Sequence, residues 1–283
     1  MNIYDCFMYF DEDLLLDLRL NILDKFVKKF VIAEATYTHN GSKKKLNFDI
    51  NKFQKFKEKI NYIVVDKQPE NILDMADGDA KDKRNEKIIL NGVARHNFQR
   101  ENLANGIKEA EENDLIIISD LDEIPNLNKL ETSDVKNNII IFEQKMFYYK
   151  FNLFYENYTW FGSKAIRNKQ FKSQQLLRNI KGKKYTNIKF IKDGGWHFTN
   201  IRTPKDLHFK FSNFAHHFDY EMSNLKVIDL EKMVRDKKVL YDHSLDKTKN
   251  KWKPSSQLKR IDQTYLPKYL LKNKSKYKMW LDE

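Results

Sequence analysis

Two aspartates, Asp120 and Asp122, follow an uninterrupted apolar run at residues 115–118. Four consecutive apolar residues, mostly β-branched, predict a central strand that is buried on both faces. In an open α/β sheet, ligands bind beyond the carboxyl ends of the strands, which is where these two acids fall. Two carboxylates spaced i, i+2 in an extended segment point to the same side and repel one another unless a cation lies between them. The pattern therefore predicts a site for Mg²⁺ or Mn²⁺.

A cation at Asp120 and Asp122 would suit a reaction in which a diphosphate leaves a sugar. Mg²⁺ is usually held by one or two carboxylates and completed by waters and substrate phosphates. It acts as a Lewis acid that neutralises a diphosphate leaving group while its bond to a sugar carbon breaks. Pro125 restricts the residue before it and helps to fix the loop. The alternative interpretation is a solvated acidic turn after the strand.

Other charged residues are predicted to reach the same edge of the sheet. Glu34 ends a second apolar run, so it is a candidate contact to a nucleotide or sugar. Arg95 and Arg100 lie on the predicted helix before the central strand, and a guanidinium fork suits phosphate oxygens. We therefore expect Glu34, Arg95, Arg100 and Asp120 to bind the donor. A local ion pair for Glu34 and an exposed helix face for the arginines are the alternatives.

The elements that must position these residues alternate along the chain. Apolar runs and helical spacing predict strand, helix, strand, helix and strand at residues 2–7, 14–26, 30–33, 48–56 and 60–65. A polar loop at 75–85 and a helix at 86–112 precede the central strand. This order predicts an α/β fold with a parallel sheet and crossover helices. Two further strands and two further helices are expected at residues 139–143, 146–151, 204–214 and 220–236.

Composition narrows the class of protein. The 283 residues include a single cysteine, Cys6, which excludes an intrachain disulfide and a cysteine-based zinc site and suits a reducing compartment. Acids interrupt the apolar stretch at the start of the sequence, so we expect no signal peptide. No run of 18 apolar residues occurs, so we expect no transmembrane helix and a cytoplasmic protein.

The positive charge is concentrated near the end of the sequence. The net charge is +12, and residues 237–283 carry 13 Lys and Arg against 5 Asp and Glu. Such a tail can attract an anionic membrane surface, which predicts peripheral membrane association. The alternative is an ordinary solvated, lysine-rich face. Nothing in the sequence predicts the oligomeric state.

Seven sequence blocks resemble a known family. They are YDCFMYFDEDLLLDLRLNIL, FVIAEATYTHNG, KFKEKINYIVVD, ARHNFQREN, DLIIISDLDEIP, GGWHF and SNFAHHFD. In this order, between about residues 3 and 219, they resemble glycosyltransferase family 17, the family of the β-1,4-mannosyl-glycoprotein 4-β-N-acetylglucosaminyltransferase. The tail beyond about residue 240 is not expected to be covered by the resemblance.

The resemblance implies a fold and a reaction. It implies a GT-A type, Rossmann-like, mostly parallel sheet flanked by helices, with the domain at residues 1–240 and a basic extension at 241–283 that packs on it or trails from it. It also implies a UDP-sugar donor, expected to be UDP-GlcNAc, a divalent metal, a glycan hydroxyl as acceptor, and inversion at the anomeric carbon. Asp120 and Asp122 fall on the metal and nucleotide motif of the family. Because the membrane helix of animal members is missing here, we expect a bacterial or viral glycan as the product.

The resemblance also extends the set of donor and metal residues. GT-A folds place the nucleoside base near the first strand, which makes Asp5 a candidate contact to the uracil or ribose. They often add a histidine from the C-terminal part to the metal. His197, after the Gly-Gly turn at 194–195, is predicted as this third ligand, with His216 and His217 as rivals.

An inverting transfer further requires a general base for the acceptor hydroxyl. The base must stand away from the metal, and Asp193 is the first candidate, with Glu123 and Glu143 as alternatives. Aromatic residues can stack on sugar rings or simply pack in the core. Those singled out are Tyr148, Tyr149, Trp160, Phe161 and Trp196.

Two other classes of protein remain as alternatives. A nucleotidyltransferase that makes an activated sugar could use the same two aspartates and a metal, but it usually carries a glycine-rich phosphate loop that residues 1–40 lack. A non-enzymatic nucleic-acid binder would suit the basic composition, but it requires a basic stripe with interleaved aromatics across the fold. Here the excess charge lies mostly in the tail, so no nucleic-acid partner is expected. The expected partners are a nucleotide sugar and a glycan.

Overall fold

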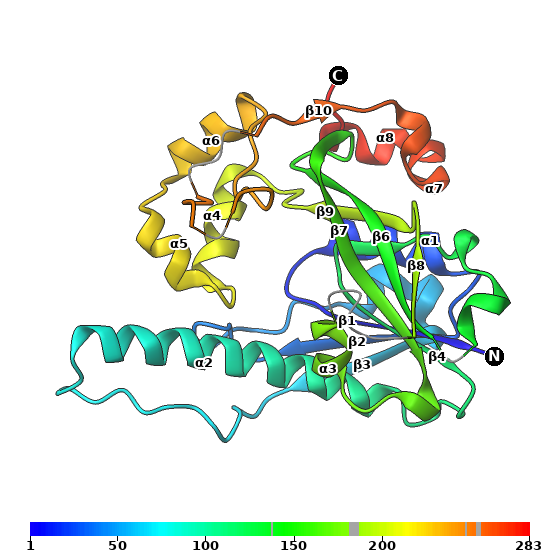
Figure 1. The fold of residues 1–283 in the computed structure, drawn as a ribbon, viewed down its shortest axis with the longest axis horizontal. Coiled ribbons are helices and arrows are strands. Elements are labelled where there is room, and N and C mark those ends of the chain that lie inside the picture. The colour runs from blue at the N-terminus through cyan, green and yellow to red at the C-terminus, as the bar shows by residue number, and fades with distance from the viewer. Residues whose placement is uncertain (137, 181–186, 247, 253–255) are drawn as a thin grey trace.

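The first half of the chain folds as a parallel α/β unit. A computed structural model describes residues 1–136, 138–180, 187–246, 248–252 and 256–283 (Figure 1). Its strands β1 (Ile3–Met8), β2 (Lys29–Ala35), β3 (Ile60–Val65) and β4 (Leu115–Asp120) are parallel, in the order β3-β2-β1-β4. The register places Cys6 beside Val31 on one side and Ile118 on the other. The predicted alternation of strands and helices is therefore confirmed.

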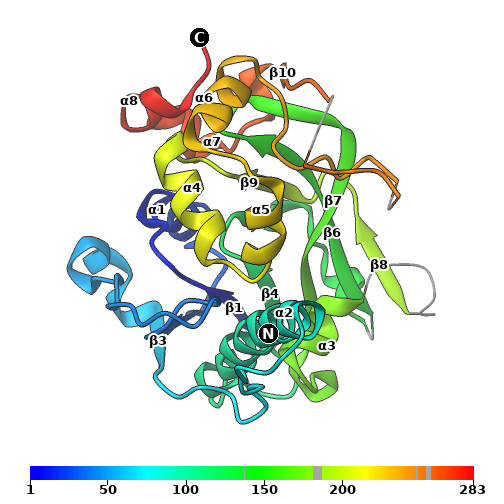
Figure 2. The ribbon, with the colours of Figure 1, turned by 90° about the vertical axis from the view of Figure 1, so that its left-hand side faces the viewer.

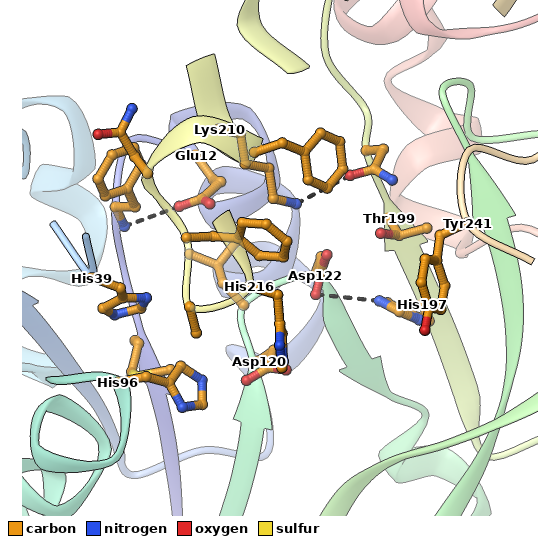
Figure 3. Close-up of a pocket in the computed structure, with 18 of the residues that line it drawn as sticks. Glu12, His39, His96, Asp120, Asp122, His197, Thr199, Lys210, His216 and Tyr241 are labelled. Carbon is orange, nitrogen blue, oxygen red and sulfur yellow. Dashed lines mark hydrogen bonds and ion pairs between the residues drawn. The ribbon is translucent and has the colours of Figure 1, made fainter. Parts of the chain in front are cut away.

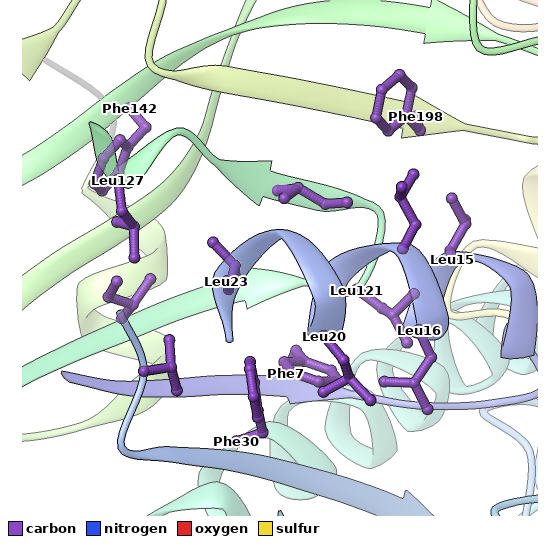
Figure 4. Packing of buried hydrophobic residues seen from close by; sticks show 14 of the residues in the cluster. Phe7, Leu15, Leu16, Leu20, Leu23, Phe30, Leu121, Leu127, Phe142 and Phe198 are labelled. Atoms are coloured by element: carbon purple, nitrogen blue, oxygen red, sulfur yellow. The ribbon is translucent and has the colours of Figure 1, made fainter. Parts of the chain in front are cut away.

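Both faces of β1, β2 and β4 are buried, which explains their continuous apolar runs, whereas the edge strand β3 is mostly half-buried. One cluster contains Phe7, Phe30 and Ile117 and packs against helix α1 (Asp13–Leu23). Figure 4 shows α1 between the strands that carry Phe7 and Phe30 and the strand that carries Phe198. The opposite face forms a second cluster, and Phe98 from helix α2 (Lys81–Glu101) packs against it.

The second half extends the sheet with mostly antiparallel pairs. Strand β7 (Leu153–Arg167) pairs with β4 and with β6 (Ile139–Tyr148), both antiparallel. The remaining strands are β5 (Glu123–Pro125), β8 (Ile188–Ile191), β9 (Gly195–Thr199) and β10 (Lys259–Arg260). β9 runs parallel to β6 and pairs with β5, which sets His197 opposite Glu123. The curled, mixed sheet flanked by helices confirms the predicted Rossmann-like glycosyltransferase fold.

Five α-helices follow β9 in the described part of the chain. An irregular segment, residues 236–246, 248–252 and 256–258, which we call the strap, lies between the third and the fourth. Helices α4 (Pro204–Asn213), α5 (His217–Ser223) and α6 (Val227–Arg235) form a lobe around a third apolar cluster shared with β6 and β7. In Figures 1 and 2 this lobe lies beside the strands and faces α2. The last residues form α7 (Lys268–Lys272) and α8 (Lys274–Tyr277), and the Tyr277 hydroxyl donates to Asp17 of α1 at 2.8 Å. Residues 266–277 thus join the core around α1.

Several element boundaries differ from those predicted. The helix predicted at 48–56 is a kinked 3₁₀ segment, Ile50–Lys59. Helix α2 begins inside the loop predicted at 75–85. Its first residues favour a helix but face solvent, so they have no apolar stripe by which the helix could be predicted. The two strands predicted at 139–151 are one strand, β6, interrupted by register shifts. The helix predicted at 220–236 is two helices, because Asn224 adopts a left-handed conformation (φ 54°). Short α3 (Gln174–Asn179) and the long strand β7 were not predicted.

Among the described residues, none of the helices is long and apolar enough to cross a membrane.

Candidate active site

A cleft of about 1060 Å³ opens at the carboxyl ends of β1 and β4. Its walls come from the parallel sheet, from α2 and α3, and from the helical lobe with the strap that follows it. Figure 3 shows Asp122 and His197 pointing toward each other inside the cleft, with His39 and His96 on the far side of Asp120. The location agrees with the rule that open α/β sheets bind ligands beyond the carboxyl ends of their strands.

Asp120 is held by two arginines from different helices. Its Oδ1 accepts from Arg100 of α2 at 2.7 Å, and its Oδ2 accepts from Arg178 of α3 at 2.8 Å. Burial raises the pKa of Asp120, but the two guanidinium groups outweigh it and hold that pKa well below the ordinary range. Asp120 is therefore ionised at any physiological pH, and both of its oxygens are engaged by the protein itself.

Glu123 organises the turn after β4. It is fully buried, and its carboxylate accepts from the Asp120 backbone (2.9 Å), from the Trp160 indole (2.5 Å) and from both Nη atoms of Arg178 (2.5 and 2.8 Å). It does not line the cleft. Its expected role as a catalytic base stays a prediction, although four donors already satisfy this carboxylate.

A second buried ion pair clamps the same turn from below. Arg19 of α1 and Asp5 of β1 form a two-point pair at 2.6 and 2.8 Å, and neither side chain is exposed. The Nη1 of Arg19 also donates to the carbonyl oxygens of Asp120, Leu121 and Glu123 at 3.2, 3.2 and 2.6 Å. Asp5 thus lies beneath the site, outside the residues that line the cleft, and its predicted contact to the nucleoside stays a prediction.

Asp122 and His197 are the pair that fits a divalent cation. The Oδ1 of Asp122 lies 3.4 Å from Nε2 of His197. Two ligands that are each about 2.1 Å from one ion and about 90–110° apart lie about 3.0–3.4 Å from each other, so the separation suits a shared ion. Burial raises the pKa of Asp122, but His197 and Lys210 outweigh it and leave the pKa lowered, so Asp122 is a ready anionic ligand.

In the part of the chain that the structure describes, this site has two such protein ligands. Over the described ranges, no three His, Cys, Asp or Glu side chains come together as a metal cluster. Mg²⁺ and Mn²⁺ commonly keep open positions for substrate phosphates, so a two-ligand site suits them when a diphosphate completes the shell. Asp120, which was predicted as a metal ligand together with Asp122 and His197, is paired with Arg100 and Arg178 in this structure.

Other predicted residues lie away from the cleft. Glu34 is fully buried and holds the chain at Asn47 and Phe48, whose backbone amides donate to it at 2.7 and 3.0 Å. Arg95 donates to Gln68 at 2.7 Å. Asp193 is 67% exposed at its side chain and pairs with Lys145. The structure does not bring Glu34, Arg95 or Asp193 into the cleft, and their functional roles stay predictions.

The two histidines predicted as alternatives to His197 as a metal ligand have different surroundings. His216 lines the cleft and lies 3.6 Å from Asp219, whereas His217 is buried and its Nδ1 lies 3.0 Å from the Phe214 carbonyl. His39 also lines the cleft. Burial lowers the pKa of His39 to about 4, and the nearby arginines add to this, so its ring is neutral.

Three charged residues of the site were missed at the level of sequence. Arg178 had no local signal, because its carboxylate partners, Glu123 and Asp120, are more than 50 positions away. Arg19 had a local signal, because it interrupts an apolar run of a helix between Leu18 and Leu20. An arginine that is buried in such a run requires a partner. Lys210 of α4 lines the cleft and donates to the neutral side chain of Asn200 at 3.2 Å, which leaves its charge available to an anionic ligand.

The fold and the cleft define an α/β enzyme built to bind a charged ligand at the end of β4. Comparison with protein families matches residues 1–282 to Glycosyltransferase family 17, so the chain belongs to this family and is a glycosyltransferase. The match includes the tail, so the expectation that the resemblance ends near residue 240 is wrong. No curated protein matched the sequence.

Proposed function

We propose that this glycosyltransferase is metal-dependent and inverting, and that it transfers GlcNAc from UDP-GlcNAc to a glycan hydroxyl. The observation that carries the proposal is the Asp122–His197 pair, which faces a cleft in a chain of family 17. Family membership favours a glycosyltransferase over both the nucleotidyltransferase and the nucleic-acid binder. When bound, Mn²⁺ or Mg²⁺ at Asp122 and His197 would neutralise the diphosphate of the donor.

The charges of the cleft suggest how the donor is oriented. Arg100 and Arg178 are balanced by Asp120 and Glu123, so these four residues form a rigid, nearly neutral floor. Lys210 is the cation on the facing wall, and its attraction contributes to the lowered pKa of Asp122. We therefore assign Lys210 as the residue that binds the diphosphate of the donor. Arg100 keeps a donor contact in this proposal, because its buried Nε has no hydrogen-bond partner among the described residues.

The acceptor proton requires an accessible carboxylate that no strong cation neutralises. Four carboxylates line the described cleft: Glu12, Asp120, Asp122 and Asp219. Glu12 pairs with Arg202 at 3.0 Å, Asp120 pairs with Arg100 and Arg178, and Asp122 is assigned to the metal. Among the described residues, Asp219 forms no ion pair with a lysine or arginine, and its Oδ2 lies 3.6 Å from Nδ1 of His216. We assign Asp219 as the base in place of Asp193 and Glu123.

The step then balances with the residues of this chain. The acceptor hydroxyl gives its proton to the Asp219 carboxylate while its oxygen bonds to the anomeric carbon from the face opposite the diphosphate. The bond from that carbon to the phosphate oxygen breaks, and its electron pair leaves with UDP. Lys210 stabilises the charge that develops on the departing diphosphate.

A donor-hydrolysis screen tests the proposal. UDP-GlcNAc, UDP-GalNAc, UDP-glucose and GDP-mannose are each incubated with the full chain, with Mn²⁺ or with EDTA. We expect release of UDP from UDP-GlcNAc above the other donors, with Mn²⁺ only. The absence of hydrolysis of every donor, or equal rates in EDTA, would contradict the proposed function.

A further inference from the structure

A chain of aromatic rings runs from the metal pair toward the outer end of the cleft. Trp160 stacks beside His197 with ring centroids 4.5 Å apart, and His243 lies 5.3 Å from Trp160. Tyr241 is 4.9 Å from His243, and Trp252 is 5.1 Å from Tyr241. Together with Tyr158, which is 5.3 Å from His243, these residues form what we call the aromatic wall: Tyr158, Trp160, Tyr241, His243 and Trp252. All five line the cleft.

The aromatic wall continues past the cleft. A second hollow, of about 510 Å³, lies beyond it and shares Asp219, Tyr241, Lys251 and Trp252 with the cleft. The two cavities are therefore neighbours along one surface. A ligand that enters from outside can follow the same rings inward to His197.

The wall is rigid, although much of it comes from a strap without regular structure. Trp252 is backed by Phe211 and Tyr220 of the helical lobe, at centroid distances of 5.9 and 5.7 Å. Next to Tyr241, the buried Asp242 accepts from the Tyr155 hydroxyl at 2.5 Å. The Tyr148 hydroxyl donates to the Tyr241 carbonyl at 3.0 Å. The rings are thus held in place before any ligand binds.

The chemistry of the wall suits a neutral sugar. Tyr and Trp rings present apolar faces to C–H groups and polar edges to hydroxyl groups. At its border, Asp219 supplies an acceptor of hydrogen bonds, and Asn250, Lys249 and Lys251 supply donors. These polar groups suit the hydroxyl groups of a sugar.

The position of the wall distinguishes it from the donor site. The donor is expected beyond the carboxyl ends of the parallel strands, where Asp120 and Arg100 lie. The aromatic wall begins at Trp160, whose indole donates to Glu123 of the floor, and leads away along β7 and the strap. In Figure 3, Tyr241 lies beside His197, on the side of Asp120 away from His96. An inverting attack requires the second substrate to approach from the side opposite the leaving group.

We propose that the aromatic wall is the acceptor subsite and binds a neutral oligosaccharide of more than one sugar ring. This inference rests on the proposed function, because it takes the wall to hold the second substrate of the same transfer. It also assigns a role to Tyr241, His243 and Trp252, which precede the part of the tail that packs on α1.

The test compares glycan binding with nucleotide binding. The full-length protein, labelled and saturated with UDP and Mn²⁺, is applied to an array of neutral oligosaccharides of two to four sugars. The variants are Trp252→Ala, Trp252→Phe, which keeps a ring in case the alanine variant is destabilised, and Tyr265→Ala, which removes an exposed ring outside the cleft. UDP affinity of each is measured separately by calorimetry.

The expected outcome is binding of the wild type to at least one glycan. In Trp252→Ala, the affinity for that glycan falls at least tenfold more than the affinity for UDP. Trp252→Phe recovers part of the loss, and Tyr265→Ala changes neither affinity. The proposal is overturned if the wild type binds UDP but no neutral glycan, if Trp252→Ala binds glycan as the wild type does, or if it loses mainly UDP. Failure of the proposed function is distinct, since it appears as no UDP binding and no donor hydrolysis.

Discussion

Removal of Arg178 should reveal how strongly the floor of the site depends on one guanidinium group. In the Arg178→Met variant, the fully buried Glu123 carboxylate loses two of its four donors and its only cation at hydrogen-bond distance among the described residues. Breaking a buried ion pair by removing one partner typically costs about 3–5 kcal/mol, because an uncompensated charge remains. We expect the free energy of unfolding to fall by about this amount.

A double-mutant cycle separates this electrostatic cost from lost packing. In the Glu123→Gln background this buried partner is already neutral, and Asp120 remains paired with Arg100, so Arg178→Met should cost at least about 2 kcal/mol less than in the wild type. The assay is urea unfolding followed by tryptophan fluorescence. Arg235→Met is the matched control, since Arg235 is 71% exposed and should change stability by less than about 0.5 kcal/mol. Equal costs of Arg178→Met in the two backgrounds would refute the reasoning.

Three further predictions concern the backbone, the pH and the base. Gly195→Ala should lower stability by about 1–3 kcal/mol in urea unfolding, because φ is +142° and a Cβ would lie 2.2 Å from the Ile124 carbonyl, whereas Gly78→Ala meets no atom and should be neutral; equal effects would contradict this. Burial lowers the pKa of His39 to about 4 from 6.5, so the stability that its neutral ring supplies is present above pH 6.5 and is lost as the pH falls toward 4. We expect His39→Gln to lose about 2 kcal/mol less than the wild type between pH 7 and 5, and an unchanged pH dependence would count against a neutral His39. Asp219→Asn should lower the kcat of transfer about 10²–10⁴-fold, as expected for a lost general base, and a kcat near that of the wild type would exclude this role.

The parallel half of the fold could be predicted because its signals are local. Residues 115–118 and the earlier apolar runs are buried on both faces, so each strand is recognisable from its own sequence. The antiparallel half carries weaker signals, and β6 was predicted from its apolar residues but as two strands. β7 has an exposed middle, and β6 contains polar residues such as Gln144 that are satisfied only by a distant strand, through Ser163.

The residues of the site also divide into those that a local sequence signal marks and those that it does not. Asp120, Asp122 and His197 were found because a short motif or a glycine turn marks them, and the structure brings all three into one cleft. Asp5, Glu34 and Asp193 were chosen for their position at strand ends or turns. Whether such a side chain faces a ligand depends on the partners that occupy it, and Arg19, Lys44 and Lys145 occupy these three. Those partners lie 10 to 48 positions away, so the sequence around each acid does not show that the acid is paired.

The most direct test of the account is the binding of Mn²⁺ in the presence of UDP, measured by electron paramagnetic resonance. The wild type is compared with Asp122→Asn and with Asp77→Asn, an exposed loop carboxylate outside the cleft. We predict UDP-dependent binding of Mn²⁺ by the wild type and by Asp77→Asn, and at least tenfold weaker binding by Asp122→Asn. Binding of Mn²⁺ and UDP by Asp122→Asn with the affinity of the wild type would contradict the assignment of the metal to Asp122 and His197.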